Sequence, residues 1–412
     1  MLIKEAAIIK GDGLLKGQDI KIDENRIAAI GPGLNADRGE EVLDGRRKLA
    51  IPGLVNAHTH LAMTLFRGYA DDMELVPWLK EKIWPLEAKL NEEDISWGVK
   101  LGCLEQIRAG ITCYCDMYLF PDETASATKK MGLRAVVGAG VFEIFPELLG
   151  GVEPFLRRWQ KDELITPAIG PHAVNTCSEQ TLLFAKELAE KYKAFIHIHL
   201  SETRQEVEEL KSRMVLSPVE YLESLGMLNS HLVAAHCVWV SPRDIEKLAA
   251  GKANVVHCPV SNMKLASGFS PVERLCSSGV NVCLGTDGAS SNNNLNIFQE
   301  MKVSAISEKC IRKNPTALPA SLVWKMATEN AYSCFGLPLG LRAGGLADLS
   351  LIDLQRPWFY PENNIVSHLI YSMTGGVDTT IVNGKILMRE GIIPGEAEIL
   401  QSAQERFERL IS

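Results

Sequence analysis

Hydrophobic and polar positions follow two different patterns along the chain. Near both ends they alternate over short runs, and turn residues such as Gly and Asp separate these runs. This period of two is typical of antiparallel strands with one buried face. An Asn383-Gly384 pair indicates a hairpin in the second stretch. We therefore expect residues 1–52 and 345–412 to pair as one small β-sandwich domain.

Between the two ends, residues 53–344 carry brief apolar runs that are separated by longer amphipathic segments. This alternation predicts repeated strand-helix units around a parallel sheet. Eight apolar runs predict a closed (β/α)8 TIM barrel, so the expected fold class is α/β. In order along the chain, the runs are IPGLVNAHTH, ITCYCDM, RAVVGAG, ITPAIGPH, AFIHIHL, HLVAAHC, ANVVHCP and VNVCLGTD.

Composition narrows the range of partners. The net charge is -8, from 43 Lys and Arg against 51 Asp and Glu, so we expect neither nucleic acid nor an anionic membrane to bind. The sequence has no run of about 18 apolar residues, and its first residues lack the pattern of a signal peptide. The ten cysteines are scattered through apolar segments, which is typical of reduced thiols in the cytoplasm. We expect a cytoplasmic protein with a small-molecule partner, and a homo-oligomer is compatible with the sequence.

Histidines gather at the predicted carboxyl ends of the barrel strands. TIM barrels build their active sites at that end, so side chains far apart in sequence would converge on one cavity. Any one of these histidines is more readily explained as a structural residue, but the set indicates a site. We expect His197, which faces the barrel one layer deeper, to be structural. The residues at the strand ends are His58, His60, His172, His199, His236, His257 and Asp287.

His58 and His60 form a His-Thr-His motif on a strand. Because side chains on a strand alternate between faces, both imidazoles face the same way and can share a metal ion. His199, His236 and Asp287 would complete a set of nitrogen and oxygen ligands that suits a divalent ion such as zinc, with one position left for water.

Longer motifs resemble the amidohydrolase superfamily over nearly the whole chain. The segments PGLVNAHTH, IHLSET, AAHC, CPVSNMKL and LGTDGASSNNNLN carry this resemblance, and LFRGYADD, WPLEAKL and TDGxxSNNN resemble the methylthioadenosine/S-adenosylhomocysteine deaminases and their relatives that act on 5'-deoxyadenosine. The resemblance implies four metal ligands, which are His58, His60, His199 and Asp287. It implies that Glu202 and His236 are catalytic residues and that Glu87 and His172 contact the substrate.

The chemistry of adenine deamination agrees with these assignments. A divalent metal lowers the pKa of a bound water to about 7, which supplies hydroxide for attack on C6. Glu202, three residues after His199, is placed to protonate ring N1. Asp287 can accept the water proton and pass it to the departing amine, so both carboxyl groups would also contact the substrate. His236 can hydrogen-bond the attacking oxygen.

Two of these carboxyl groups also have structural interpretations. Glu202 could stabilise the start of the next helix. Glu87 follows Trp-Pro-Leu and, without the resemblance, is best explained as part of a solvated helix face. With it, Glu87 is expected to accept hydrogen bonds from ribose hydroxyls.

One divalent ion per subunit is expected. The fourth strand, ITPAIGPH, has no lysine that could be carbamylated to bridge two metals, as the binuclear branch of the superfamily requires. Zinc suits the ligands best, although iron, manganese and nickel suit them nearly as well.

The predicted function is hydrolytic deamination of 5'-modified adenosines to the inosine analogue and ammonia by a metal-dependent aminohydrolase. Candidate substrates are 5'-methylthioadenosine, 5'-deoxyadenosine, S-adenosylhomocysteine and adenosine. A guanine or cytosine deaminase and a triazine chlorohydrolase are alternatives, because they use the same metal-hydroxide attack. A non-catalytic assembly protein on this fold is a remote alternative, since every ligand position is filled.

The segment after the third barrel strand departs from the family pattern. Relatives that handle S-adenosylhomocysteine are expected to place arginines there to bind its carboxylate. Here the only arginine of the strand, Arg134, opens it, and either Arg157 or Arg158 would have to swing in. An apolar pocket favours 5'-deoxyadenosine or methylthioadenosine. The apolar residues that follow the strand are Phe142, Ile144 and Phe145.

Overall fold

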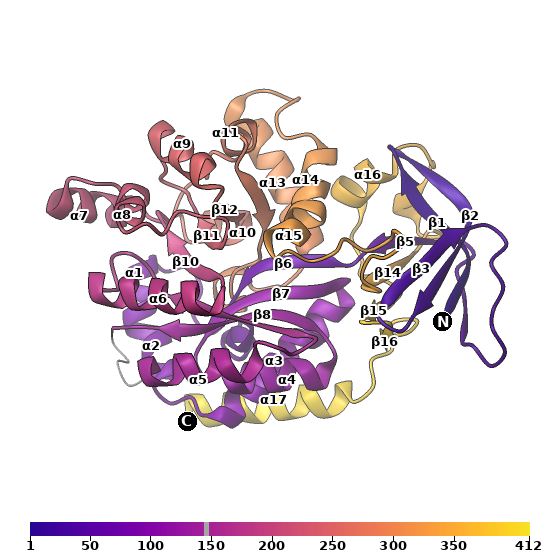
Figure 1. Cartoon of the computed structure of the whole chain (residues 1–412), viewed down its shortest axis with the longest axis horizontal. Coiled ribbons are helices and arrows are strands. Elements are labelled where there is room, and N and C mark those ends of the chain that lie inside the picture. Colours follow the sequence, from indigo (N-terminus) through magenta and orange to yellow (C-terminus); the bar gives the residue numbers. More distant parts are fainter. Residues whose placement is uncertain (144–147) are drawn as a thin grey trace.

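Eight parallel strands form the centre of the molecule (Figure 1). The structure is a computed structural model that describes residues 1–143 and 148–412. Each strand pairs with the next in chain order, and the first and last strands meet where Asp287 N donates to His58 O at 3.0 Å. A Cβ on Gly285 would lie 2.8 Å from His58 N, so this close approach requires glycine. The strands are β6 (Leu54–Thr59), β7 (Ile111–Tyr118), β8 (Arg134–Val141), β9 (Ile165–Pro171), β10 (Ile196–Leu200), β11 (Leu232–His236), β12 (Asn254–His257) and β13 (Asn281–Leu284).

These strands coincide with the eight apolar runs, which confirms the predicted barrel. Amphipathic helices between the strands cover the outside of the barrel, and Ser178, Ser217 and Ser241 cap three of them by accepting a backbone N–H. The helices up to β13 are α3 (Glu92–Arg108), α4 (Pro121–Met131), α5 (Leu149–Trp159), α6 (Glu179–Tyr192), α7 (Arg204–Met214), α8 (Pro218–Ser224), α9 (Pro242–Gly251), α10 (Pro259–Lys264) and α11 (Val272–Ser277). Those after it are α12 (Ala289–Asn292), α13 (Ile297–Arg312), α14 (Ala320–Ala327) and α15 (Glu329–Cys334).

A long connection joins β6 to α3 and lies over the carboxyl ends of the strands. It contains η1 (Leu61–Phe66), α1 (Leu75–Trp78), the π-helical turn η2 (Leu79–Ile83) and α2 (Trp84–Glu87).

The two chain ends form a second sheet beside the barrel (Figure 1). β14 pairs antiparallel with β5, from Leu349 opposite Pro52 to Asp353 opposite Lys48, so the expected pairing of the two ends is confirmed. The strands of both chain ends belong to one hydrogen-bonded sheet, which has its own apolar core that includes Ile20. The strands are β1 (Leu2–Lys10), β2 (Gly13–Asp23), β3 (Arg26–Gly31), β4 (Val42–Asp44), β5 (Lys48–Pro52), β14 (Leu349–Asp353), β15 (Thr379–Val382) and β16 (Lys385–Met388).

The rest of the C-terminal stretch packs on the barrel. The last helix, α17 (Glu396–Ile411), runs along α3, where Arg406 pairs with Glu93 at 2.6 Å (Figure 1). Just before α3, Lys89 Nζ donates to Leu410 O at 2.9 Å. The stretch also contains η4 (Pro357–Phe359), α16 (Ile365–Ser367) and η5 (His368–Ser372). Residues 345–412 therefore combine sheet strands with helices that cover the barrel.

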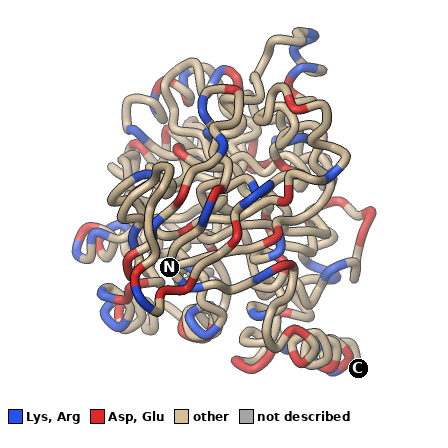
Figure 2. The backbone as a smooth tube through the Cα atoms, turned by 90° about the vertical axis from the view of Figure 1, so that its right-hand side faces the viewer, with Lys and Arg blue, Asp and Glu red and all other residues tan. Residues whose placement is uncertain are grey.

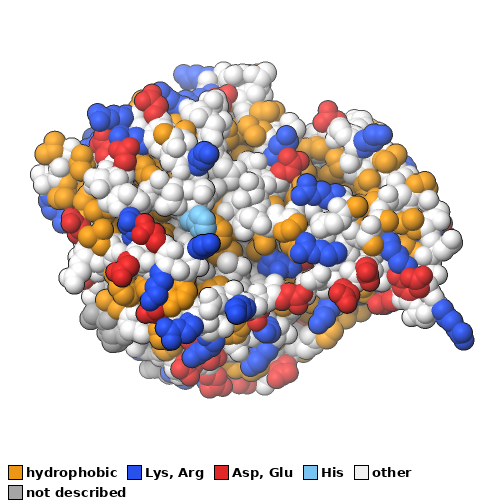
Figure 3. Space-filling model, in the orientation of Figure 1, with side chains coloured by type: hydrophobic (Ala, Val, Ile, Leu, Met, Phe, Trp, Pro, Cys, Tyr) orange, Lys and Arg blue, Asp and Glu red, His pale blue; other side chains and the backbone are white. Residues whose placement is uncertain are grey.

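Charges of both signs are interspersed over the side that carries the chain-end sheet (Figure 2). Hydrophobic side chains are likewise scattered among charged ones on the face in Figure 3. Of the helices within the described residues, none is both long and apolar enough to cross a membrane. All ten cysteines are free thiols, and most are buried.

Candidate metal centre and active site

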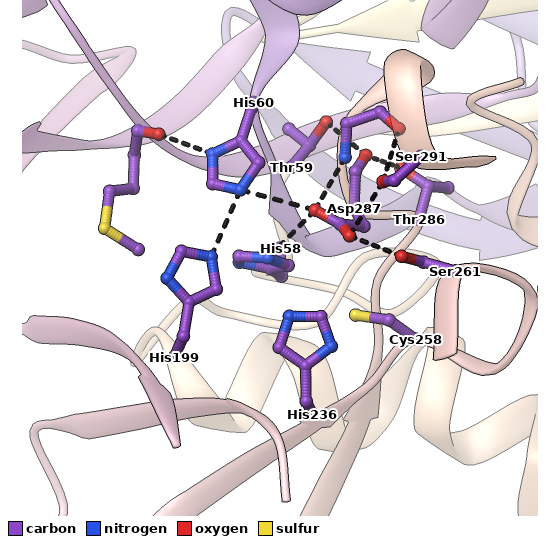
Figure 4. Close-up of polar contacts among 12 residues, drawn as sticks. His58, Thr59, His60, His199, His236, Cys258, Ser261, Thr286, Asp287 and Ser291 are labelled. Atoms are coloured by element: carbon purple, nitrogen blue, oxygen red, sulfur yellow. Dashed lines mark hydrogen bonds and ion pairs between the residues drawn. The ribbon is translucent and has the colours of Figure 1, made fainter. Parts of the chain in front are cut away.

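Polar side chains from four barrel strands face one point at the carboxyl end of the barrel (Figure 4). His58 and His60 come from the end of β6, His199 from β10, and Asp287 follows β13. His60 Nε2 lies 3.2 Å from His199 Nε2. Asp287 Oδ1 lies 3.3 Å from His60 Nε2 and 3.4 Å from His58 Nε2. His236, from the end of β11, borders the same space (Figure 4).

The other ring nitrogen of each histidine predicted as a ligand has a hydrogen-bond partner. His60 Nδ1 lies 2.6 Å from Met117 O, and His199 Nδ1 lies 2.7 Å from His172 O. Because a carbonyl oxygen accepts, both Nδ1 atoms carry hydrogen, and both Nε2 atoms face the common point. His58 Nδ1 lies 2.8 Å from His197 Nε2. The residue that we interpreted as structural therefore orients one of the predicted ligands.

The cluster fits a cation. His58 Nε2 is fully buried and has no hydrogen-bond partner among the described residues. Burial lowers the pKa of His58 to about 3, which keeps this ring neutral. Burial also lowers the pKa of His60, but Asp287 outweighs this effect and raises it to about 9. Since Asp287 attracts positive charge to a point where neutral imidazole nitrogens also converge, the donor set suits a divalent ion.

Asp287 is held by its own neighbours. Oδ2 accepts hydrogen bonds from Ser261 Oγ at 2.5 Å and from Ser291 Oγ at 2.9 Å, and Oδ1 accepts one from Gly288 N at 2.8 Å. Burial raises the pKa of this carboxyl group, but the adjacent rings of His58 and His60 outweigh burial and hold the pKa well below its usual value. Asp287 is therefore an ionised carboxylate with a fixed direction.

Glu202 and His236 face each other next to the cluster. Glu202 Oε2 lies 3.8 Å from His236 Nε2, and Glu202 Oε1 accepts a hydrogen bond from Ser267 Oγ at 3.3 Å. His236 Nδ1 lies 2.8 Å from Asn262 Oδ1, so Nε2 is the nitrogen that faces Glu202. Burial raises the pKa of Glu202, which favours a protonated carboxyl group that can donate.

The predicted substrate contacts lie farther out. Glu87, in α2, accepts a hydrogen bond from Tyr118 Oη at 2.7 Å, and burial raises its pKa. His172 follows β9, with Nδ1 2.8 Å from Thr176 Oγ1, and burial lowers its pKa to about 4. His257 does not line this cavity: it is buried at a separate small cavity against α10 and α13.

A cavity of about 350 Å³ connects these groups, which is within the range of small-molecule sites. His58 is buried beneath it. One wall comes from the long connection after β6, through Leu75, Trp78, Ile83 and Trp84. This wall was not predicted from the sequence. Two tryptophans, Trp78 and Trp84, in a segment with many charged residues could have indicated it. The predicted residues that line the cavity are His60, Glu87, His172, His199, Glu202, His236 and Asp287.

The segment after β8 contributes Phe142 to the cavity, and its ring lies 5.6 Å from that of His172. Ile144 and Phe145 lie outside the described residues. Arg134 is buried and pairs with Asp348 at 2.8 Å. The two arginines that could have acted as a clamp, Arg157 and Arg158, line a separate surface hollow beside Phe184 instead of the cavity.

Comparison with known proteins identifies the family. The model of the amidohydrolase family matches residues 49–387. A 5'-deoxyadenosine deaminase of Methanothrix thermoacetophila is 60% identical over 412 residues, with 100% of both chains covered. A 5-methylthioadenosine/S-adenosylhomocysteine deaminase of Archaeoglobus fulgidus is 42% identical, with 100% of this chain and 99% of the relative covered.

A solved structure agrees. An adenosine deaminase from Xanthomonas campestris with bound zinc superposes with a TM-score of 0.94 at 32% identity, and the match covers 99% of this chain and 98% of that one. The chain belongs to the amidohydrolase family. The family predicted from the motifs is thereby confirmed.

Proposed function

We propose that this protein hydrolyses the amino group of the adenine ring in 5'-modified adenosines and releases the inosine analogue and ammonia. The observation that carries the proposal is the pairing of half-buried Glu202 with buried His236, 3.8 Å apart, beside a histidine and aspartate cluster at the base of a cavity. The names of two relatives, at 60% and 42% identity, refer to 5'-deoxyadenosine, 5-methylthioadenosine and S-adenosylhomocysteine, which supports this substrate class.

The ligand residues would hold one divalent ion, for which we propose zinc. Nitrogen and oxygen donors suit zinc, and iron, manganese and nickel are the alternatives for the same donors. When bound, the ion would lower the pKa of a water molecule and so supply the nucleophile at neutral pH. The proposed ligands are His58, His60, His199 and Asp287.

Two carboxyl groups would move protons during the reaction, and one histidine would stabilise the developing charge. Protonated Glu202 would donate to ring N1 as C6 becomes tetrahedral, which makes the ring electrophilic. Asp287 would accept one proton of the attacking water and deliver it to the departing amine, which leaves as ammonia, while the second proton of that water would return to Glu202 as the C6 carbonyl forms. His236, directed by Asn262, would hydrogen-bond the attacking oxygen and stabilise its charge.

The outer cavity would select the nucleoside. Glu87, oriented by Tyr118, would accept hydrogen bonds from the ribose hydroxyls, and His172 would contact the substrate nearby. Phe142 and Trp84 give this part of the cavity apolar surface, while Glu143 adds a carboxyl group at its edge. An uncharged 5' group would gain from burial there. We therefore propose a preference for 5'-deoxyadenosine or methylthioadenosine over S-adenosylhomocysteine.

Ammonia release from a substrate panel tests the proposed function. The panel contains 5'-deoxyadenosine, methylthioadenosine, S-adenosylhomocysteine and adenosine, with guanine, cytosine and a chlorotriazine as rivals, compared as kcat/KM. Chloride release is followed for the triazine. The proposal predicts turnover of the adenosines alone. A higher kcat/KM for any of the three rivals would overturn it.

A further inference from the structure

Three helix starts in this chain share one local pattern, and a fourth helix has the same residue types but a different contact. Three helices begin with a complete capping box, in which the acid at the third helical position accepts a hydrogen bond from the backbone N–H of the capping residue. The distances are between 2.7 and 3.0 Å. The pairs are Asn91 with Asp94 at α3, Ser217 with Glu220 at α8, and Ser241 with Asp244 at α9.

Helix α7 has the same pattern but uses its acid differently. Thr203 Oγ1 accepts a hydrogen bond from Glu206 N at 3.1 Å, as a capping residue should. The Glu206 carboxylate, however, reaches beyond Thr203. Oε1 accepts from Ser201 N at 3.0 Å, and Oε2 accepts from Glu202 N at 2.8 Å. Both oxygens of one carboxylate therefore hold two successive backbone N–H groups of the turn that carries Glu202.

This turn has an unusual backbone. Ser201 has a φ of 52°, which is the left-handed region that L-residues with a side chain adopt with strain. Ser201 O accepts a hydrogen bond from Trp239 N at 2.8 Å, which ties the turn to the segment after β11. The turn is thus held on both sides of Ser201, and it directs the Glu202 side chain toward His236.

Glu206 is also a buried carboxyl group in the wall of the cavity. Its residue is 5% exposed, and none of the lysine, arginine or histidine side chains described forms an ion pair with it. Burying a carboxylate without a counter-ion is unfavourable unless hydrogen bonds compensate. The two N–H groups of the Glu202 turn offset part of this cost, although burial still raises the pKa of Glu206 to about 7.

We propose that Glu206 is a positioning residue for Glu202, which fixes the turn between β10 and α7 so that the Glu202 carboxyl group reaches His236 and the substrate. This inference rests on the proposed role of Glu202. It extends that role to a residue that does not itself need to touch the reacting atoms.

The test is a double-mutant cycle of kcat for ammonia release from 5'-deoxyadenosine. Glu206→Gln keeps the side-chain shape but turns an amide N–H toward a backbone N–H, so one hydrogen bond is lost. We expect kcat to fall by roughly tenfold to a hundredfold, the scale of a small misplacement of reacting groups, with bound metal unchanged. In a Glu202→Gln background, the same substitution should change kcat by less than about twofold, because positioning has no effect once the positioned group is gone.

Glu220→Gln is the matched control, because it removes the corresponding acid from the capping box of α8. It should lower the thermal midpoint and leave kcat unchanged. If Glu206→Gln behaves like this control, the residue is only a cap and the proposal is wrong. An equal loss of kcat from Glu206→Gln in both backgrounds would likewise overturn it.

Two further variants complete the design. If Glu206→Gln does not fold, Glu206→Asp replaces it, because it keeps the charge and both acceptors but is too short to reach both N–H groups. We expect Glu206→Asp to lower kcat to the same extent in the protein that retains Glu202, and to leave kcat nearly unchanged in the Glu202→Gln variant. Normal kcat in the Glu202→Gln single variant would refute the proposed role of Glu202, and with it this inference. That failure is distinguishable, because it appears before Glu206 is changed.

Discussion

The two large sheets of this protein differ in where their strands end. In the barrel, all eight strands run parallel, so their carboxyl ends meet at one edge and bring histidines from β6, β10 and β11 together. In the chain-end sheet, most neighbouring strands run antiparallel, so their ends are divided between two edges. The closed parallel barrel therefore gathers polar side chains from several strands at one edge, whereas the arrangement of the chain-end sheet does not.

Buried charges show the same difference. In the region that joins the chain-end sheet to the barrel, Asp348 accepts hydrogen bonds from Arg134 Nε at 2.8 Å and from Asn383 N at 2.7 Å, so each charge has a fixed partner. At the barrel edge, His58 Nε2 has no such hydrogen bond, and several imidazole nitrogens face one point. The hydrogen-bonded pair of Arg134 and Asp348 contributes to stability, whereas a nitrogen without a hydrogen bond, such as His58 Nε2, is available for a ligand.

The largest expected effect comes from the proposed metal ligands. His58→Ala or Asp287→Ala should abolish both stoichiometric metal binding and deamination, because each removes one of four ligands. Metal content by elemental analysis and ammonia release measure the two losses. His257→Asn serves as control, since this residue lies outside the cavity and should keep both. Full metal and normal turnover in either ligand variant would refute the assignment.

The next largest effect concerns stability at the joint between the sheets. Asp348→Ala leaves Arg134 buried without its partner, and we expect the free energy of unfolding to fall by about 3–5 kcal/mol. Denaturant unfolding measures this change, while metal content and kcat per folded molecule should stay as in the parent. A drop in metal content that exceeds the loss of folded protein would show that the Arg134–Asp348 pair also affects the metal centre.

The proposed proton donor should have a smaller effect. Glu202→Gln should lower kcat by roughly 10² or more with metal retained. Burial raises the pKa of Glu202, and the required protonated form is lost as pH rises through that pKa, so kcat/KM of the parent should fall on the alkaline side. The variant should lack this decline. An unchanged kcat would move the proton transfer elsewhere, with His236 the first residue to examine.

Sequence pattern was sufficient for the strands and for the residues at their ends. Each barrel strand is an apolar run, and strand order alone brings His60, His199 and Asp287 to one edge. Pattern failed where side-chain direction depends on details of register or loop geometry: His257 ends a strand like the others, yet it lies outside the cavity. The hydrogen bonds of Glu206 were equally hidden, because Thr-x-x-Glu predicts an ordinary capping box.

The smallest expected effect concerns the 5' substituent. We expect kcat/KM for 5'-deoxyadenosine or methylthioadenosine to exceed that for S-adenosylhomocysteine by about tenfold, which corresponds to one interaction of about 1.4 kcal/mol. The reason is that Phe142 lines the cavity whereas Arg157 and Arg158 lie outside it. If S-adenosylhomocysteine has the highest kcat/KM, the apolar-pocket argument is wrong and one of these arginines is the first to mutate.

The most direct test of the account is removal and return of the metal ion. The protein is treated with a chelator, and ammonia release from 5'-deoxyadenosine is measured before treatment, after it, and after stepwise addition of Zn²⁺. The account predicts that activity disappears with the metal and returns in proportion to the ion bound, reaching full activity at one ion per chain. Undiminished turnover in the metal-free protein would contradict it.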